Sequence, residues 1–155
     1  MKEFLTGVDA DMDQLKLVAL DEQDLSIVSA HAQDAVMKVA DLNFSASAKR
    51  FVLTMNRFAW ETKTGFLRPR YQRRKSVLDF NRVLGVRTTG VARDKPDDVL
   101  SLLAIRFHER EAPAGVIELV LAGGGAIALQ VECIEARLTD VGGAWEAASR
   151  PIHKI

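Results

Sequence analysis

The residues best suited to bind a charged ligand form one basic segment, which begins at Arg68 and ends at Lys75. Five of its eight residues are bases, one is an aromatic, and a proline near its start favours an extended chain. Arginine carries a planar fork of N–H donors that matches a phosphate or a carboxylate, and a tyrosine ring can stack on an exposed base. The segment predicts an anion-binding site made of Arg68, Arg70, Tyr71, Arg73, Arg74 and Lys75.

The charges of the chain are unevenly distributed, although the formal net charge is zero. Residues 1–48 hold three bases and nine acids, residues 49–95 hold thirteen bases and three acids, and residues 96–155 hold five bases and nine acids. The basic segment is therefore the centre of a block with a net charge of +10. In a second interpretation it is a solvated loop whose charge balances the acidic blocks, or residues 9–24 of another copy of the chain.

Two further motifs contain the residue types of known sites, but their spacing favours structural roles. Gly123–Gly125 lacks the lysine and the following helix of a phosphate-binding loop, and alternating apolar residues on both sides predict a hairpin turn. Ser29, His31 and Asp34 are the residue types of a nucleophilic set. On a helix Ser29 and His31 point about 200° apart, so we expect helix-surface or capping roles for these residues.

A small enzyme is the remaining alternative, with a site made of His108 and carboxylates on neighbouring strands. Glu109 follows His108 directly, while Glu132, Glu135 and Asp140 would join the site only if the strands bring them close. The three histidines of the chain have no metal-ligand spacing, and no motif fixes a nucleophile. We therefore expect no catalytic residue, no metal and no cofactor.

Hydrophobic periodicity predicts the elements that position these residues. Asp21, with another acid three residues later, predicts the start of a helix that runs to about Gln33. A phase slip in the alternation predicts a β-bulge near Arg57, and the polar residues 62–75 predict a loop. Period-two alternation or continuous apolar character predicts strands at residues 15–20, 35–42, 51–60, 78–86, 100–107, 117–121 and 127–133. Residues 132–141 fit either a strand or a helix, and residues 145–149 predict a short C-terminal helix.

One helix and about seven antiparallel strands predict an α+β fold. We expect a mostly antiparallel two-layer sheet or a partly closed barrel, for which a pleckstrin-homology-like topology is one arrangement. Residues 1–13 are expected to form a flexible acidic leader, and residues 14–155 a single domain. The single cysteine, Cys133, excludes an internal disulfide, and the chain shows neither a secretory signal nor a stretch of about 20 apolar residues. These features predict a cytoplasmic protein.

Several strings of the sequence are characteristic of one family: Ser29–Ala35, Asn56–Phe58 with Trp60, Ser101–Phe107, Gly123–Ile127 and Val131–Ala136. Together they resemble the bacterial domain-of-unknown-function family 2948, over about Leu15 to Pro151. The resemblance implies a small stand-alone bacterial cytoplasmic protein, and it carries no catalytic or binding residues.

From these observations we expect a non-catalytic binding or interaction module. Its basic segment would hold an anionic partner, either nucleic acid or an acidic protein surface. A self-associating structural protein and a small enzyme are the alternatives.

Overall fold

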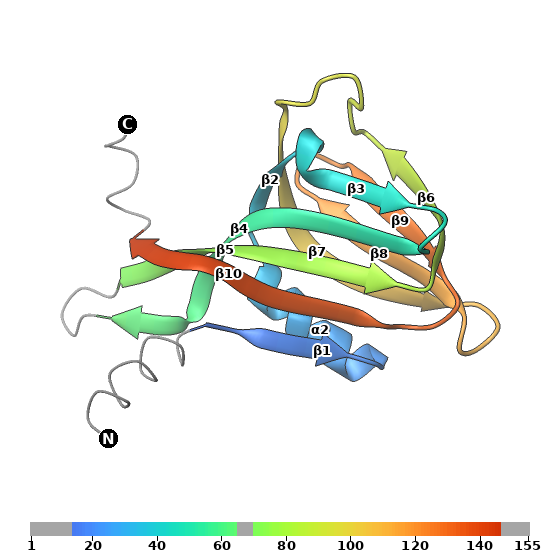
Figure 1. The fold of residues 1–155 in the computed structure, drawn as a ribbon, viewed down its shortest axis with the longest axis horizontal. Helices are drawn as coiled ribbons and strands as arrows, with labels where there is room; N and C mark the ends of the chain where they lie inside the picture. Colours follow the sequence, from blue (N-terminus) through green and yellow to red (C-terminus); the bar gives the residue numbers. More distant parts are fainter. Residues whose placement is uncertain (1–13, 65–69, 147–155) are drawn as a thin grey trace.

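The computed structural model describes residues 14–64 and 70–146. Figure 1 shows a long curved sheet with one helix packed against it. The strands are β1 (Lys16–Ala19), β2 (Val36–Lys38), β3 (Leu42–Ser45), β4 (Arg50–Thr64), β5 (Arg70–Asn81), β6 (Val83–Thr89), β7 (Val99–Glu109), β8 (Gly115–Leu121), β9 (Ala126–Val131) and β10 (Ala136–Glu146). The helix α2 (Glu22–Ala32) follows β1, and the short 3₁₀ helix η1 (Val39–Asp41) joins β2 to β3.

All ten described strands belong to one antiparallel sheet. Its order is β1-β10-β5-β4-β2-β7-β8-β9-β6, and β3 pairs with β4 outside this path. The terminal strands β1 and β6 do not pair with each other, so the sheet is open and is not a closed barrel. The expectation of a mostly antiparallel sheet with one helix in the N-terminal half is confirmed.

The strands alternate apolar and polar side chains, and the apolar side chains form the core on the concave side of the sheet. In β8 the side chains of Ile117, Leu119 and Leu121 are buried while their neighbours are half-buried. The helix α2 adds Leu25 and Val28 to the same cluster and packs on β7, β1 and β4. Each such fully buried side chain contributes roughly 1.5–3 kcal/mol of hydrophobic stabilisation.

Local hydrogen bonds begin the helix and attach it to the sheet. The Asp21 carboxylate accepts a hydrogen bond of 2.8 Å from the backbone N–H of Asp24, as the capping pattern predicts. The Ser29 hydroxyl oxygen accepts a hydrogen bond of 2.9 Å from the backbone N–H of Ile105 in β7. The predicted helix and its start at Asp21 are therefore confirmed.

The expected loop at residues 62–75 is wrong at residues 62–64 and 70–75, and its residues 65–69 lie outside the described ranges. Strand β4 continues to Thr64 and β5 begins at Arg70, and the two strands form a long hairpin. The prediction failed because it relied on an alternating apolar face. This part of the hairpin extends past the core, so backbone hydrogen bonds hold its strands together without such a face. The predicted bulge near Arg57 is also misplaced, because the register shifts between Ala59 and Lys63.

Three further expectations are settled by the sheet. The ambiguous segment 132–141 is mostly strand, because β10 pairs with β5 on one side and with β1 on the other. The predicted C-terminal helix is wrong at Trp145 and Glu146, which belong to β10, and its remaining residues lie outside the described ranges, as does the predicted leader 1–13. The single strand expected at 78–86 is two strands, separated at Arg82, whose φ is 63°.

The hairpin predicted around the three glycines is confirmed. Strands β8 and β9 pair in antiparallel register from Val120 and Ala126 onward, and the turn between them contains Gly123 and Gly124 at φ values of 87° and 94°. Such values strain any residue with a Cβ. Among the described residues, no helix is long and apolar enough to cross a membrane.

Candidate basic face

Strand β5 sends the bases of the predicted anion-binding segment to opposite faces. Arg74 points inward and is only 3% exposed, whereas Lys75 is exposed and Arg73 is half-buried on the outer face. Arg70 and Tyr71 lie in β5 but their side chains are not described, and Arg68 lies outside the described residues. Among the described side chains of the segment, Arg74 therefore lies on the opposite face of β5 from Arg73 and Lys75.

A hollow of about 630 Å³ adjoins Lys75 on the outer face of β5. It exists because β2 pairs with β4 at one position only, Val36 with Asn56, before the chain leaves the strand as η1. Lys75 and Lys38 contribute to its lining. Its other lining residues are Val36, Met37, Asp41, Thr54, Met55, Asn56 and Val99. We call Arg73, Lys75 and Lys38 with this hollow the basic face.

Arg73 is fixed at the edge of the basic face by an aromatic ring. Its guanidinium carbon lies 4.1 Å from the centre of the Phe58 ring, on the neighbouring strand β4. A cation–π contact of this kind is worth about 0.5–2 kcal/mol. Because Arg73 covers one side of the Phe58 ring, no base can stack on that side. At this position the basic face can therefore bind a ligand through charge but not through stacking.

The positive charge of the basic face is only partly neutralised. Lys38 lies 3.8 Å from Asp97, and both side chains are largely exposed, so solvent weakens the pair. Within the described residues, neither Lys75 nor Lys16 forms an ion pair. Lys16 occupies the same outer face, since it pairs with Thr139, which in turn pairs with Val77 of β5.

Other bases of the +10 block are paired with carboxylates elsewhere on the molecule. Lys49 lies 3.0 Å from Glu132, and Arg82 lies 3.9 Å from Glu132 and 3.5 Å from Glu135. Arg50 reaches Asp79 at 3.5 Å. Part of the block therefore balances acidic residues of the same chain.

The inner face of the same hairpin contains a buried polar cluster that the sequence did not reveal. Arg57 donates two hydrogen bonds to Asp140, of 2.9 Å from Nε and 2.8 Å from Nη2, and both side chains are fully buried. The Ser76 hydroxyl donates a third hydrogen bond of 2.6 Å to Asp140, and the backbone N–H of Leu15 donates a fourth of 2.8 Å. The cluster thus connects β4, β5 and β10 with the residue preceding β1.

These contacts hold Asp140 in its charged form. Burial by itself raises the pKa of a carboxyl group. Here the hydrogen bonds from Arg57, Ser76 and Leu15, with the charge of Arg57, outweigh burial and hold the pKa of Asp140 below its ordinary value of 3.8. Every oxygen of the carboxylate accepts a hydrogen bond from within the protein, so the cluster is built for structure rather than for a ligand.

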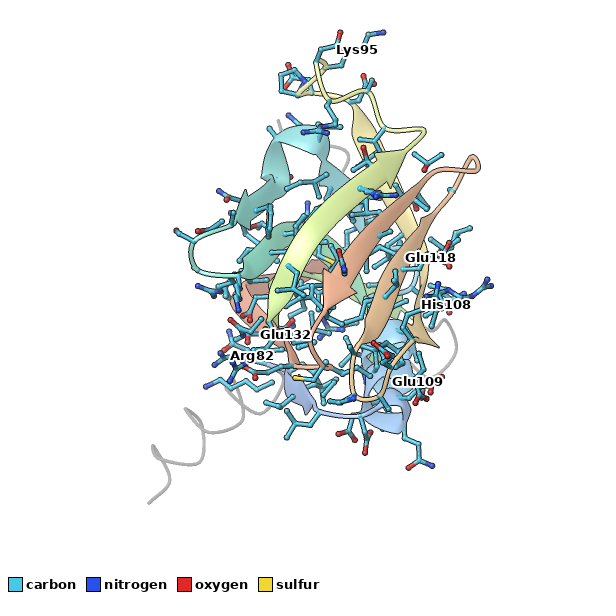
Figure 2. All side chains as sticks on the ribbon, turned by 90° about the vertical axis from the view of Figure 1, so that its right-hand side faces the viewer. Arg82, Lys95, His108, Glu109, Glu118 and Glu132 are labelled. Carbon is cyan, nitrogen blue, oxygen red and sulfur yellow. The ribbon has the colours of Figure 1, made fainter. Side chains whose placement is uncertain are left out.

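The residues of the proposed enzymatic site are not assembled. The His108 ring nitrogen Nε2 lies 2.8 Å from the Glu118 carboxylate across the β7–β8 ladder. Figure 2 shows Glu132 beside Arg82, on the opposite side of this face from His108. A hollow of about 280 Å³ does adjoin His108, lined with Ser26, Glu22 and Arg106 among others. The described residues contain no group of three or more side chains able to hold a metal.

The Ser29, His31 and Asp34 set is also separated. Ser29 is occupied by the backbone of Ile105, and His31 Nδ1 lies 2.9 Å from the carbonyl oxygen of Ile27 in its own helix. Asp34 follows the helix at φ 66°. Ser29 and His31 therefore make separate structural contacts, and Asp34 lies in the turn between α2 and β2.

Sequence reasoning found Arg73 and Lys75 but missed Lys38 and the Arg57–Asp140 pair. Lys38 joins the basic face only because β2 lies beside β4 in the sheet, which no local pattern reveals. The burial of Arg57 could have been inferred from the sequence. Arg57 alternates in step with Met55 and Ala59 on the buried face of the strand, and an arginine at such a position predicts a buried carboxylate partner.

Searches of curated proteins and of solved structures each found no match. The family model described as "Protein of unknown function (DUF2948)" matches residues 15–153. Because this match spans nearly the whole sequence, the resemblance seen in the sequence strings is confirmed, and the chain belongs to the family DUF2948.

Proposed function

We propose that this protein is a non-catalytic binding module whose basic face holds the phosphate backbone of a nucleic acid. One observation carries the proposal: Arg73 and Lys75 share the outer face of the hairpin, and Lys75 and Lys38 line the same hollow of about 630 Å³. The predicted bacterial cytoplasmic location would place the protein among such polyanions.

The lysine side chains on this side of the molecule favour a phosphate backbone over an acidic protein surface as the partner. Lys75, Lys38 and Lys16 are exposed, and a lysine ammonium contacts phosphate oxygens as a point charge without a fixed geometry. The covered side of the Phe58 ring argues against recognition by stacking there. We therefore expect binding that depends on charge and salt and is insensitive to base sequence.

The test measures binding of a fluorescent single-stranded oligonucleotide by anisotropy, at several salt concentrations. The double variant Lys38→Glu with Lys75→Glu should lose most of the affinity, and the slope of log K against log salt should fall by about 0.7 for each phosphate that the variant no longer neutralises. The matched control is Arg110→Glu, an exposed base without a described ion pair, which follows β7 at the end of that strand opposite to Val99, the partner of Lys38. It should retain near-wild-type affinity.

Two results would contradict the proposal. One is the absence of binding by the wild type at low salt, and the other is an equal loss of affinity in Arg110→Glu and in the double variant. A salt-sensitive dimer that forms without any oligonucleotide would support the self-association alternative instead. Arg74→Glu is not a useful variant for this purpose, because a buried glutamate would test folding.

The pleckstrin-homology-like arrangement also remains a proposal. The open antiparallel sheet with one helix supports it. The terminal helix that would complete such a fold would have to follow Glu146, where β10 ends.

A further inference from the structure

The sheet has a window where the edge strands β3 and β6 face each other. At one end the window is closed by a hydrogen bond of 2.9 Å from the backbone N–H of Val83 to the carbonyl oxygen of Lys49. At the other end, the backbone N–H groups of Val39 and Ala40 in η1 donate hydrogen bonds of 3.0 Å to the loop that follows β6. Between these closures β3 pairs only with β4, and β6 only with β9.

The window opens into a cavity of about 260 Å³ with an apolar interior. Its walls are Leu42 and Phe44 of β3, Val86 of β6, Phe51 of β4 and Val39. Phe51 belongs to the buried core, and Leu42, Phe44 and Val86 pack against that core. A water molecule occupies about 30 Å³, so the cavity has room for about nine non-hydrogen atoms of similar volume.

Three polar side chains also line the cavity, and one of them is charged. Arg93 is an exposed residue of the loop after β6, while Thr88 and Asn43 come from the two edge strands. Within the described residues Arg93 forms no ion pair. A guanidinium with no described carboxylate partner is available to a ligand, and its planar fork matches a carboxylate.

We propose that this window binds a small amphipathic carboxylate, such as a medium-chain fatty acid, with its tail between β3 and β6 and its carboxylate on Arg93. The closed ends argue against a peptide strand, because a chain running along β6 would have to pass both closures. Asp94 and Asp98 lie in the same loop as Arg93 and disfavour a doubly charged phosphate group. The site is separate from the basic face and does not depend on the proposed function.

The experiment titrates the protein with octanoate below its micelle concentration, by calorimetry and by backbone amide NMR shifts. Octanoate should bind saturably and shift resonances of β3 and β6, whereas octan-1-ol and acetate should each bind at least tenfold more weakly. Arg93→Met should weaken octanoate binding by roughly tenfold or more, in line with loss of a charge-assisted hydrogen bond. Arg87→Met is the matched control, since Arg87 is an exposed arginine that lines a different hollow of about 660 Å³.

A second variant tests the apolar part of the site. Thr88→Phe places a ring in the cavity and should abolish octanoate binding while the protein stays folded by circular dichroism. Three results would overturn the proposal: no saturable binding of octanoate, equal affinity for octan-1-ol, or equal effects of Arg93→Met and Arg87→Met. Because Arg93 is exposed in a loop, its variant is expected to fold, and the outcome can be interpreted even if Thr88→Phe does not.

Discussion

Replacing Asp140 with asparagine should destabilise this protein more than replacing any exposed carboxylate. The substitution preserves the shape of the side chain but removes the charge that faces Arg57. Both side chains are fully buried, and their hydrogen bonds measure 2.8 and 2.9 Å. Without the carboxylate of Asp140 the buried guanidinium of Arg57 loses both hydrogen bonds to a negative charge.

The expected loss of stability can be estimated from buried ion pairs in other proteins. Removing one partner costs about 3–5 kcal/mol, which is a large part of a typical total stability of about 5–15 kcal/mol. With a urea m-value of about 2 kcal/mol/M for a domain of this size, the unfolding midpoint should fall by roughly 1.5–2.5 M. The control is Asp97→Asn, whose carboxylate pairs with Lys38 at 3.8 Å on the exposed surface. That variant should change the stability by less than about 0.5 kcal/mol.

The pH dependence of unfolding gives an independent measure of the same pair. The pKa of Asp140 is held below 3.8 in the folded protein, so its contribution is fully present above the unfolded pKa and is lost as the pH falls through the folded value. The difference in urea midpoint between wild type and Asp140→Asn should therefore be constant above about pH 5 and shrink below about pH 4.

Two results would refute this reasoning about the buried pair. One is an Asp140→Asn midpoint within about 0.3 M of the wild type. The other is a midpoint difference that does not narrow in acid. The double variant Arg57→Met with Asp140→Leu separates charge from packing, because replacing both partners with apolar residues is often close to neutral. It should be more stable than Asp140→Asn.

Two further substitutions test how the sheet is held together. Ser29→Ala removes the acceptor of the Ile105 N–H hydrogen bond and should lower the free energy of unfolding by about 1–3 kcal/mol, with faster amide exchange at Ile105. Gly115→Ala should cost about 1–3 kcal/mol in the same measurement, because its new Cβ would lie 2.5 Å from the carbonyl oxygen of His108 and 2.6 Å from the Phe107 ring. A Gly115→Ala protein as stable as wild type would contradict the close packing of β7 on β8.

The sequence was informative wherever a local rule determined the structure. The helix start at Asp21 and the hairpin turn at Gly123 depend on neighbours along the chain, and both were predictable. The β4–β5 hairpin beyond the core was not, because its strands are held by ladder hydrogen bonds rather than by an alternating apolar face. The partnership of Arg57 with Asp140 joins residues 83 positions apart, and no spacing rule relates residues so distant.

The hairpin changes how the basic segment can act. Successive side chains of a strand point to opposite faces of the sheet, so neighbouring bases in the segment lie on different faces. In a loop, Arg73, Arg74 and Lys75 could converge on one ligand. In β5 the outer face receives Arg73 and Lys75, while Arg74 points inward and is paired in register with Arg57. Two like charges opposite each other destabilise a sheet, and the carboxylate of Asp140 opposes that repulsion by binding Arg57. The basic face and the buried cluster are therefore the two sides of one hairpin, and a charge reversal reports on binding at 73 or 75 but on folding at 74.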